Sequence, residues 1–182
     1  MKRISEKTLY KGKWIQLQEI TYKGKNNEEL KWERIKRTNT TNTVVIISKL
    51  VPSNKYIFIK QYRAAIDKYV IGFPAGLVEG DDIGENALRE LEEETGYKGE
   101  VKSMSPLLYS NPALLTDKVT LARVDIYEDL MENQIPIQKL EPDEDIQVIA
   151  LHREELKDFL IKEQASGTAI GMGVWYVFYG LS

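Results

Sequence analysis

Apolar and polar residues alternate along much of this chain with a period of two, which is the spacing of a half-buried β-strand. In the first forty residues this alternation predicts two strands, near Trp14–Tyr22 and Leu30–Thr38, joined by a turn that contains Gly24. Further strands are predicted at Val44–Val51, Tyr56–Arg63, Tyr69–Phe73, Val101–Ser110, Lys118–Tyr127 and Ile146–Leu151.

Helical patterns occur in the middle of the chain and at its end. Asp82 can cap a helix, with Glu85 completing a capping box, and Gly96 is a natural residue to end it. Two more helices are predicted over residues 153–164 and 168–180. The acidic stretch 128–144 contains two prolines and is predicted to be irregular; loops of this length are often functional lids.

Composition restricts the available chemistry. The 182 residues include no cysteine, which excludes disulfides, thiolate nucleophiles and sulfur-ligated zinc. The single histidine, His152, lies beside charged residues and is expected at the surface. A net charge of −3 gives no electrostatic footprint for nucleic acid. Without a signal peptide or a membrane-spanning run, a cytoplasmic protein with no membrane partner is expected.

The predicted central helix carries an unusual concentration of acids. At about 100° per residue, Glu90, Glu93 and Glu94 fall on one face, opposite the apolar residues. Acids are unfavourable near the C-terminal end of a helix, and like charges four residues apart repel each other. A solvated acidic face is the simpler interpretation, but a divalent cation would remove both penalties. Oxygen ligands, without histidine or cysteine, indicate Mg²⁺, with Mn²⁺ as an alternative.

This segment resembles the Nudix box, G-x5-E-x7-R-E-U-x-E-E-x-G-U, in which U is a bulky apolar residue. The part from Arg89 to Tyr97 matches at every specified position. In the first part, Asp81 stands where the box has glutamate, five residues after Gly76 instead of six. The resemblance implies that Glu90, Glu93 and Glu94 bind metal and that Arg89, Glu93 and Glu94 belong to the catalytic centre. It leaves open whether Asp81 orients Arg89.

The resemblance extends to the ADP-ribose pyrophosphatase subgroup. The run Gly72–Leu77 is similar to the E-F-P-A-G segment of that subgroup, with Gly72 in place of glutamate. It implies that the carbonyl of Ala75 ligates metal and that Leu77 contacts substrate. Pro112, sixteen residues after Gly96, has the spacing of a substrate-binding proline in the subgroup. Taken alone, a proline at this point is a turn residue.

Three further features have counterparts in this subgroup. Glu144 resembles the catalytic glutamate of a late loop, with Asp143 and Asp145 as alternatives in register. Trp14 and Trp32 resemble two tryptophans that sandwich adenine across a dimer, although tryptophans in strands usually pack in a core. Arg37 and Arg63 occupy positions where the subgroup has arginines near phosphate or ribose; otherwise they are solvated edge residues.

Together these features imply an α+β fold, an α/β/α sandwich around a mixed sheet, over residues 41–182. Residues 1–40 would form an antiparallel β subdomain that mediates homodimerisation. The expected activity is magnesium-dependent hydrolysis of ADP-ribose to AMP and ribose 5-phosphate. Another nucleotide sugar, such as ADP-glucose or a GDP-sugar, and a catalytically inactive nucleotide-binding module remain alternatives. A hydrolase of capped RNA would need a basic groove, which the acidic composition does not favour.

Overall fold

The computed structural model describes residues 1–40 and 42–179. Its helices are α1 (Ile83–Thr95), α2 (Met131–Gln134), α3 (Arg153–Ala165) and α4 (Met172–Tyr179). Its strands are β1 (Lys2–Lys11), β2 (Ile15–Lys23), β3 (Glu29–Arg37), β4 (Asn42–Val51), β5 (Tyr56–Arg63), β6 (Lys68–Gly72), β7 (Ala75–Leu77), β8 (Glu100–Met104), β9 (Leu108–Tyr109), β10 (Lys118–Tyr127), β11 (Ile146–Leu151) and β12 (Ala169–Ile170).

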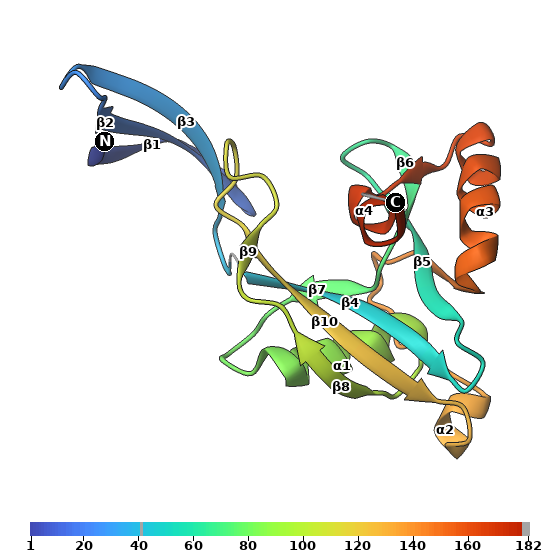
Figure 1. Ribbon diagram of the computed structural model, residues 1–182. Helices are drawn as coiled ribbons and strands as arrows, with labels where there is room; N and C mark the ends of the chain where they lie inside the picture. The colour runs from blue at the N-terminus through green and yellow to red at the C-terminus, as the bar shows by residue number, and fades with distance from the viewer. Residues whose placement is uncertain (41, 180–182) are drawn as a thin grey trace.

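The N-terminal strands form a separate antiparallel sheet in the order β1-β2-β3. Figure 1 shows this sheet projecting from the rest of the molecule. It meets the body at the loop between β9 and β10, where the Ile35 amide donates to the Leu114 carbonyl (2.8 Å) and the Thr116 amide donates to the Ile35 carbonyl (3.2 Å). The sheet has no helix packed on it among the described residues, and every residue of β1 is exposed.

The body is built on a mixed sheet in the order β12-β6-β5-β4-β10-β8, with β7, β9 and β11 paired to its members. Parallel pairing joins β4 to β10 along their whole length, from Asn42 opposite Lys118 to Val51 opposite Tyr127. The β5–β6 and β5–β11 pairs are antiparallel.

Strand β4 explains why the sheet is covered on both faces. Its alternate residues Val44 and Ile46 belong to the core beneath α1, whereas Val45 and Ile47 pack against a second core formed with α3 and α4. Apolar side chains at consecutive positions therefore serve opposite faces, as expected for a strand buried on both sides. The expected α/β/α sandwich around a mixed sheet is confirmed. In the described part of the chain, no helix has the length and apolarity needed to cross a membrane.

The structure corrects several predicted elements. The N-terminal segment contains three strands instead of two, because β1 precedes the predicted pair. The single strand predicted over Val101–Ser110 is wrong: β8 and β9 are separated by a break around Pro106, which cannot donate to a ladder. The stretch predicted to be irregular includes α2, and the last helix begins at Met172, after β12. Thr41, at the predicted domain boundary, and Gly180, at the predicted helix end, lie outside the described residues.

Candidate active site

Helix α1 begins and ends as its sequence predicts. The Asp82 side chain accepts a hydrogen bond from the Glu85 amide (2.9 Å), and Gly96 ends the helix with φ +77°, a left-handed conformation that favours glycine. Ala87 and Leu91 are fully buried against the sheet. The helix is therefore fixed in rotation, and its acidic face points to one side of the body.

A pocket of about 270 Å³ lies along this acidic face. It is lined by Ala75, Gly76, Leu77, Glu79, Arg89, Glu90, Glu93, Lys139, Glu141 and Glu144. The structure thus brings together five predicted site residues from α1 and β7 with Glu144, which is distant in sequence. Glu94 lies beneath the pocket, 2% exposed, and its carboxylate accepts a hydrogen bond from the Ala75 amide (3.0 Å).

Burial and crowding make two of these acids difficult to ionise. Burial raises the pKa of Glu94 to about 8, and the negative charges of Glu90 and Glu144 add to the effect, while the Ala75 amide and Arg63 oppose it. Burial also raises the pKa of Glu90; Arg89 opposes this rise, and Glu93 and Glu144 add to it. The site therefore contains more negative charge than its own cations neutralise.

The carboxylates on the pocket side are held by Arg89. Its guanidinium donates to Glu90 (2.7 Å) and to Glu93 (2.7 Å), so one cation bridges two acids on the helix. Within the described residues, no three acidic, histidine or cysteine side chains are grouped closely enough to hold a metal ion as they stand. Glu90 and Glu93 are turned towards Arg89, and Glu94 towards the Ala75 amide.

Gly76 explains how β7 comes so close to α1. A Cβ atom at this position would overlap the carboxyl group and Cγ of Glu90. A larger residue at position 76 would have to displace the Glu90 side chain from its place beside the strand, so the first residue of the box has a steric role. Strand β7 is itself held by pairing to β4, with Ala75 opposite Val45.

The late loop places Glu144, and neither neighbouring aspartate, at this pocket. The Glu144 carboxylate accepts a hydrogen bond from the Glu141 amide of the same loop (3.0 Å). Asp145 accepts a hydrogen bond from the Tyr69 hydroxyl, and its carbonyl accepts one from the Tyr62 amide (3.2 Å). Asp143 is exposed and does not line the pocket. Of the three acids, Glu144 alone lines the glutamate pocket, and its catalytic role stays a prediction.

Sequence reasoning missed three charged residues of the pocket, Glu79, Lys139 and Glu141. Burial lowers the pKa of Arg89, but the nearby charges of Glu90, Glu93 and Glu79 together outweigh burial and raise it above its usual value. The structure shows no hydrogen bond or ion pair between Asp81 and Arg89, and Asp81 is exposed. Glu79 could have been recognised from the sequence as a candidate site residue, because it lies within the segment that resembles the Nudix box. Lys139 was not detectable, because only the fold brings it to Glu92, which it contacts at 2.6 Å.

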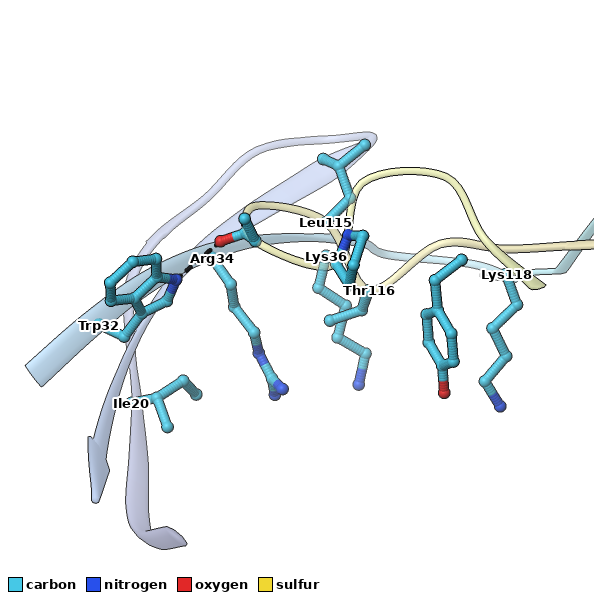
Figure 2. Close-up of a pocket in the computed structure, with 10 residues that line it drawn as sticks. Ile20, Trp32, Arg34, Lys36, Leu115, Thr116 and Lys118 are labelled. Atoms are coloured by element: carbon cyan, nitrogen blue, oxygen red, sulfur yellow. Dashed lines mark hydrogen bonds between the residues drawn. The ribbon is translucent and has the colours of Figure 1, made fainter. Parts of the chain in front are cut away.

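A larger hollow of about 510 Å³ lies elsewhere, where the N-terminal sheet meets the β9–β10 loop. It contains Trp32 and Pro112, two of the predicted substrate-binding residues, and shares no lining residue with the glutamate pocket. The Trp32 indole donates to the Ala113 carbonyl (2.7 Å), which fixes its ring against the loop. Figure 2 shows Arg34, Lys36 and Lys118 extending in the same direction along the hollow, and Tyr109 also lines it.

The other predicted substrate-binding residues, Trp14, Arg37 and Arg63, are not gathered in one place. Trp14 is 64% exposed in the bend before β2, with Lys13 4.4 Å above its ring, and Trp32 is 53% exposed. Neither tryptophan is therefore a core residue of this chain. Arg37 pairs with Asp117 (2.8 Å), and Arg63 is exposed at the end of β5. Among the described residues, neither Trp14, Arg37 nor Arg63 lines the two pockets.

Comparison with known proteins identifies the family. A model of the NUDIX domain matches residues 40–168. An ADP-ribose pyrophosphatase of Saccharomyces cerevisiae is 33% identical over 178 residues, which cover 93% of this chain and 77% of that protein. An ADP-sugar pyrophosphatase of Mus musculus is 32% identical over 160 residues, which cover 84% of this chain and 73% of that protein.

A solved structure supports the same fold. The crystal structure of an ADP compounds hydrolase superposes with a TM-score of 0.64 at 19% identity, covering 92% of this chain and 96% of the other. The glutamate-bearing helix and the strand that packs on it lie within the matched region. On the strength of the domain match and of relatives that align over most of its length, the chain belongs to the Nudix hydrolase family.

Proposed function

We propose that this chain is a magnesium-dependent pyrophosphohydrolase that converts ADP-ribose and water into AMP and ribose 5-phosphate. The observation that carries the proposal is the excess of carboxylates around the glutamate pocket, where Glu90 and Glu94 resist ionisation because they are buried among other acids. A fold gains nothing from such crowding unless a cation is bound there. The names of the yeast and mouse relatives favour an ADP-sugar as substrate.

The residues present fit a hard divalent cation. Glu90, Glu93 and Glu94, with the carbonyl of Ala75, offer only oxygen ligands, which is the preference of Mg²⁺ and also suits Mn²⁺. Since Arg89 holds two of these acids, a cation competes with its guanidinium for them. When bound, the cation would neutralise the diphosphate and make a nearby water more acidic.

Glu144 is proposed as the general base. It lines the same pocket as Glu90 and belongs to a loop that is fastened to the body on both sides. In this role it accepts the proton of the water that attacks phosphorus, while the P–O bond of the bridging oxygen breaks and AMP or ribose 5-phosphate leaves. Lys139, at the rim, and Arg89 would balance the negative charge of the diphosphate.

The Trp32 hollow is proposed to hold the nucleoside end of the substrate. An exposed indole fixed by a hydrogen bond is a stacking surface for a base, and the adjacent Arg34, Lys36 and Lys118 favour an anionic ligand. In one chain this hollow and the glutamate pocket have no residue in common. We therefore infer a homodimer in which the N-terminal sheet of one chain serves the other, with Trp14 completing the stack.

A substrate panel tests the proposal. Purified protein is incubated with Mg²⁺ and, separately, ADP-ribose, ADP-glucose and a GDP-sugar, and the products are separated by ion-exchange chromatography. We expect ADP-ribose to have the highest kcat/KM and to yield AMP with ribose 5-phosphate. Preference for a GDP-sugar would contradict the substrate, and binding without turnover of any compound would contradict the activity in favour of a nucleotide-binding module. Repetition with EDTA, and with Mn²⁺ in place of Mg²⁺, tests the metal.

A further inference from the structure

The C-terminal end of α1 is covered by a segment that lies forty residues later in the chain. This segment, Pro136–Lys139, is called the strap. It passes so close to Gly96 that a Cβ atom there would overlap the backbone of Pro136 and Ile137. Gly96 is thus required both for its left-handed φ of +77° and for contact with the strap.

The strap also satisfies carbonyls that the helix leaves free. The last carbonyls of an α-helix have no partner within the helix. Here the Glu92 carbonyl accepts from the Gly96 amide (2.8 Å), and the Glu93 carbonyl accepts from the Lys139 amide of the strap (2.8 Å). The Glu94 carbonyl accepts from the side-chain amide of Gln138 (2.6 Å). The backbone of two proposed metal-binding residues is therefore bonded to the strap.

Gln138 makes a second bond that gives it a special position. Its amide nitrogen, Nε2, also donates to the carbonyl of Ile146, the first residue of β11, at 3.2 Å. Both acceptors are carbonyl oxygens, so the orientation of the amide group follows from its partners, and both of its hydrogens are used. The side chain thus joins the end of the metal-binding helix to the start of β11, across the base of the loop 139–145.

That loop contains Glu144, two residues before the Ile146 carbonyl. The C-terminal end of the loop is also held through Asp145, whose carboxylate and carbonyl accept from the Tyr69 hydroxyl and the Tyr62 amide, and the Glu144 carboxylate accepts from the Glu141 amide. Within the described residues, Gln138 is the side chain that bonds this loop's base to the backbone of Glu94. Loss of Gln138 would leave the bonds of Asp145 and the bond from the Lys139 amide to the Glu93 carbonyl in place, and would remove the link between the end of α1 and the Ile146 carbonyl.

We propose that Gln138 is a positioning residue that sets Glu144 against the metal-binding face of α1. The proposal rests on the function proposed above, because it assigns Gln138 to the placement of the general base. Gln138 does not line the pocket, so it acts through the loop. The geometry of proton transfer from water to Glu144 then depends on the side-chain amide of Gln138, a residue outside the Nudix box.

The test uses near-isosteric variants of the full-length protein. Gln138→Met keeps the length of the side chain and removes both donors; Gln138→Glu places a carboxylate against two carbonyls. The control is Gln147→Met, at an exposed position on β11 for which the structure shows no side-chain hydrogen bond. With ADP-ribose and saturating Mg²⁺, we expect kcat to fall about tenfold in Gln138→Met and further in Gln138→Glu. KM should change less than about twofold, and the control should match the wild type.

Hydrogen exchange followed by mass spectrometry supplies a readout that does not depend on activity. In Gln138→Met, peptides that cover residues 139–145 should exchange about tenfold faster, while peptides from the middle of α1 should exchange as in the wild type. Unchanged hydrogen exchange in residues 139–145 would mean that Gln138 does not hold the loop, and it would overturn the proposal. Faster exchange with normal kcat would overturn the positioning role.

A wild type that hydrolyses no substrate would instead refute the proposed function, and the exchange data alone would then decide whether Gln138 holds the loop. If Gln138→Met does not fold, Gln138→Asn, whose amide is too short to reach both carbonyls, takes its place. A fall in kcat in that variant with exchange raised throughout the protein, and not only in residues 139–145, would indicate a merely structural residue and overturn the proposal.

Discussion

Glu94 shows at the scale of one residue how the site is built. A carboxyl group with a pKa of about 8 binds its proton more tightly in the folded chain than in the unfolded chain, where its pKa is 4.5. Between pH 4.5 and 8, the folded state therefore holds more protons, and the free energy of unfolding decreases as pH rises. This loss of stability with rising pH is expected of a buried carboxylate whose charge a bound cation would neutralise.

The first prediction follows from this sign. In EDTA, the thermal midpoint of the wild type should decrease as the pH is raised from 5 towards 8, and Glu94→Gln should flatten that decrease. Added Mg²⁺ should restore the wild-type midpoint at pH 8 and have little effect on the variant. Calorimetry or a dye-based melt over this pH range is sufficient. If the thermal midpoint changed equally with pH in the two proteins, the proposed effect of Glu94 on stability would be contradicted.

The second prediction concerns turnover. Glu90→Gln and Glu94→Gln should each lower kcat by several orders of magnitude, because they remove ligands of the cation. Since each also removes a repulsion between like charges, the metal-free variants should melt no earlier than the wild type. Glu92→Gln is a matched control, because Glu92 pairs with Lys139 at the surface and does not line the pocket. Near-normal turnover in Glu90→Gln or Glu94→Gln would refute the metal assignment.

The third prediction separates the acids of the late loop. Glu144→Gln should lower kcat far more than it changes KM, as expected for a group that acts in the transition state. Asp143→Asn should be close to the wild type, since Asp143 is exposed away from the pocket. Asp145→Asn should weaken the bond from Tyr69 and have an intermediate effect. Steady-state kinetics on the three variants measure this order, and a larger loss in Asp143→Asn than in Glu144→Gln would reverse the assignment.

At the scale of elements, α1 was predictable because its signals are local. Its cap, its final glycine and the face shared by three glutamates all follow from spacing within one helix. Strand β1 was not predicted, because two irregularities in its pairing with β2, between Arg3 and Ser5 and between Thr8 and Tyr10, interrupt the alternation that reveals a strand. The strap was undetectable for a different reason: its partners on α1 are more than forty residues away, and no local pattern records such contacts.

The fourth prediction uses the strap. Gly96→Ala should destabilise the protein by more than the roughly 1 kcal/mol expected for a left-handed alanine, because the added methyl group meets the strap. Gly80→Ala is the control: Gly80 also has positive φ, +71°, but a methyl group added there would meet no atom within 4 Å. Denaturant unfolding of both variants gives the difference. Equal losses would mean that the strap yields to the methyl group at no cost.

At the scale of the whole molecule, the N-terminal sheet and the body make separate contributions to the proposed site. The fifth prediction is that sedimentation shows a dimer, and that Trp14→Ala and Trp32→Ala weaken binding of AMP by roughly tenfold to a hundredfold. Both tryptophans are exposed in the single chain, so their loss should lower its thermal midpoint only slightly, and more in Trp32→Ala, which also loses the hydrogen bond to the Ala113 carbonyl. Trp175→Ala, on α4, removes a third exposed tryptophan and is the control. A monomer, or normal AMP binding by both variants, would contradict the shared site.

The hollow beside Trp32 has one wall on β3 and the other on the loop that leads into β10. A nucleotide that fills it must hold the two walls at a constant separation, so it acts as a brace between the sheet and the body. Binding of the nucleotide in the hollow and separation of the N-terminal sheet from the body then exclude each other. We expect cleavage by trypsin after Lys36 or Arg37 to proceed from the opened form and to slow by the factor 1 + [L]/Kd as AMP is added. A protease would in this way measure affinity for the nucleotide without any chemistry at the glutamates.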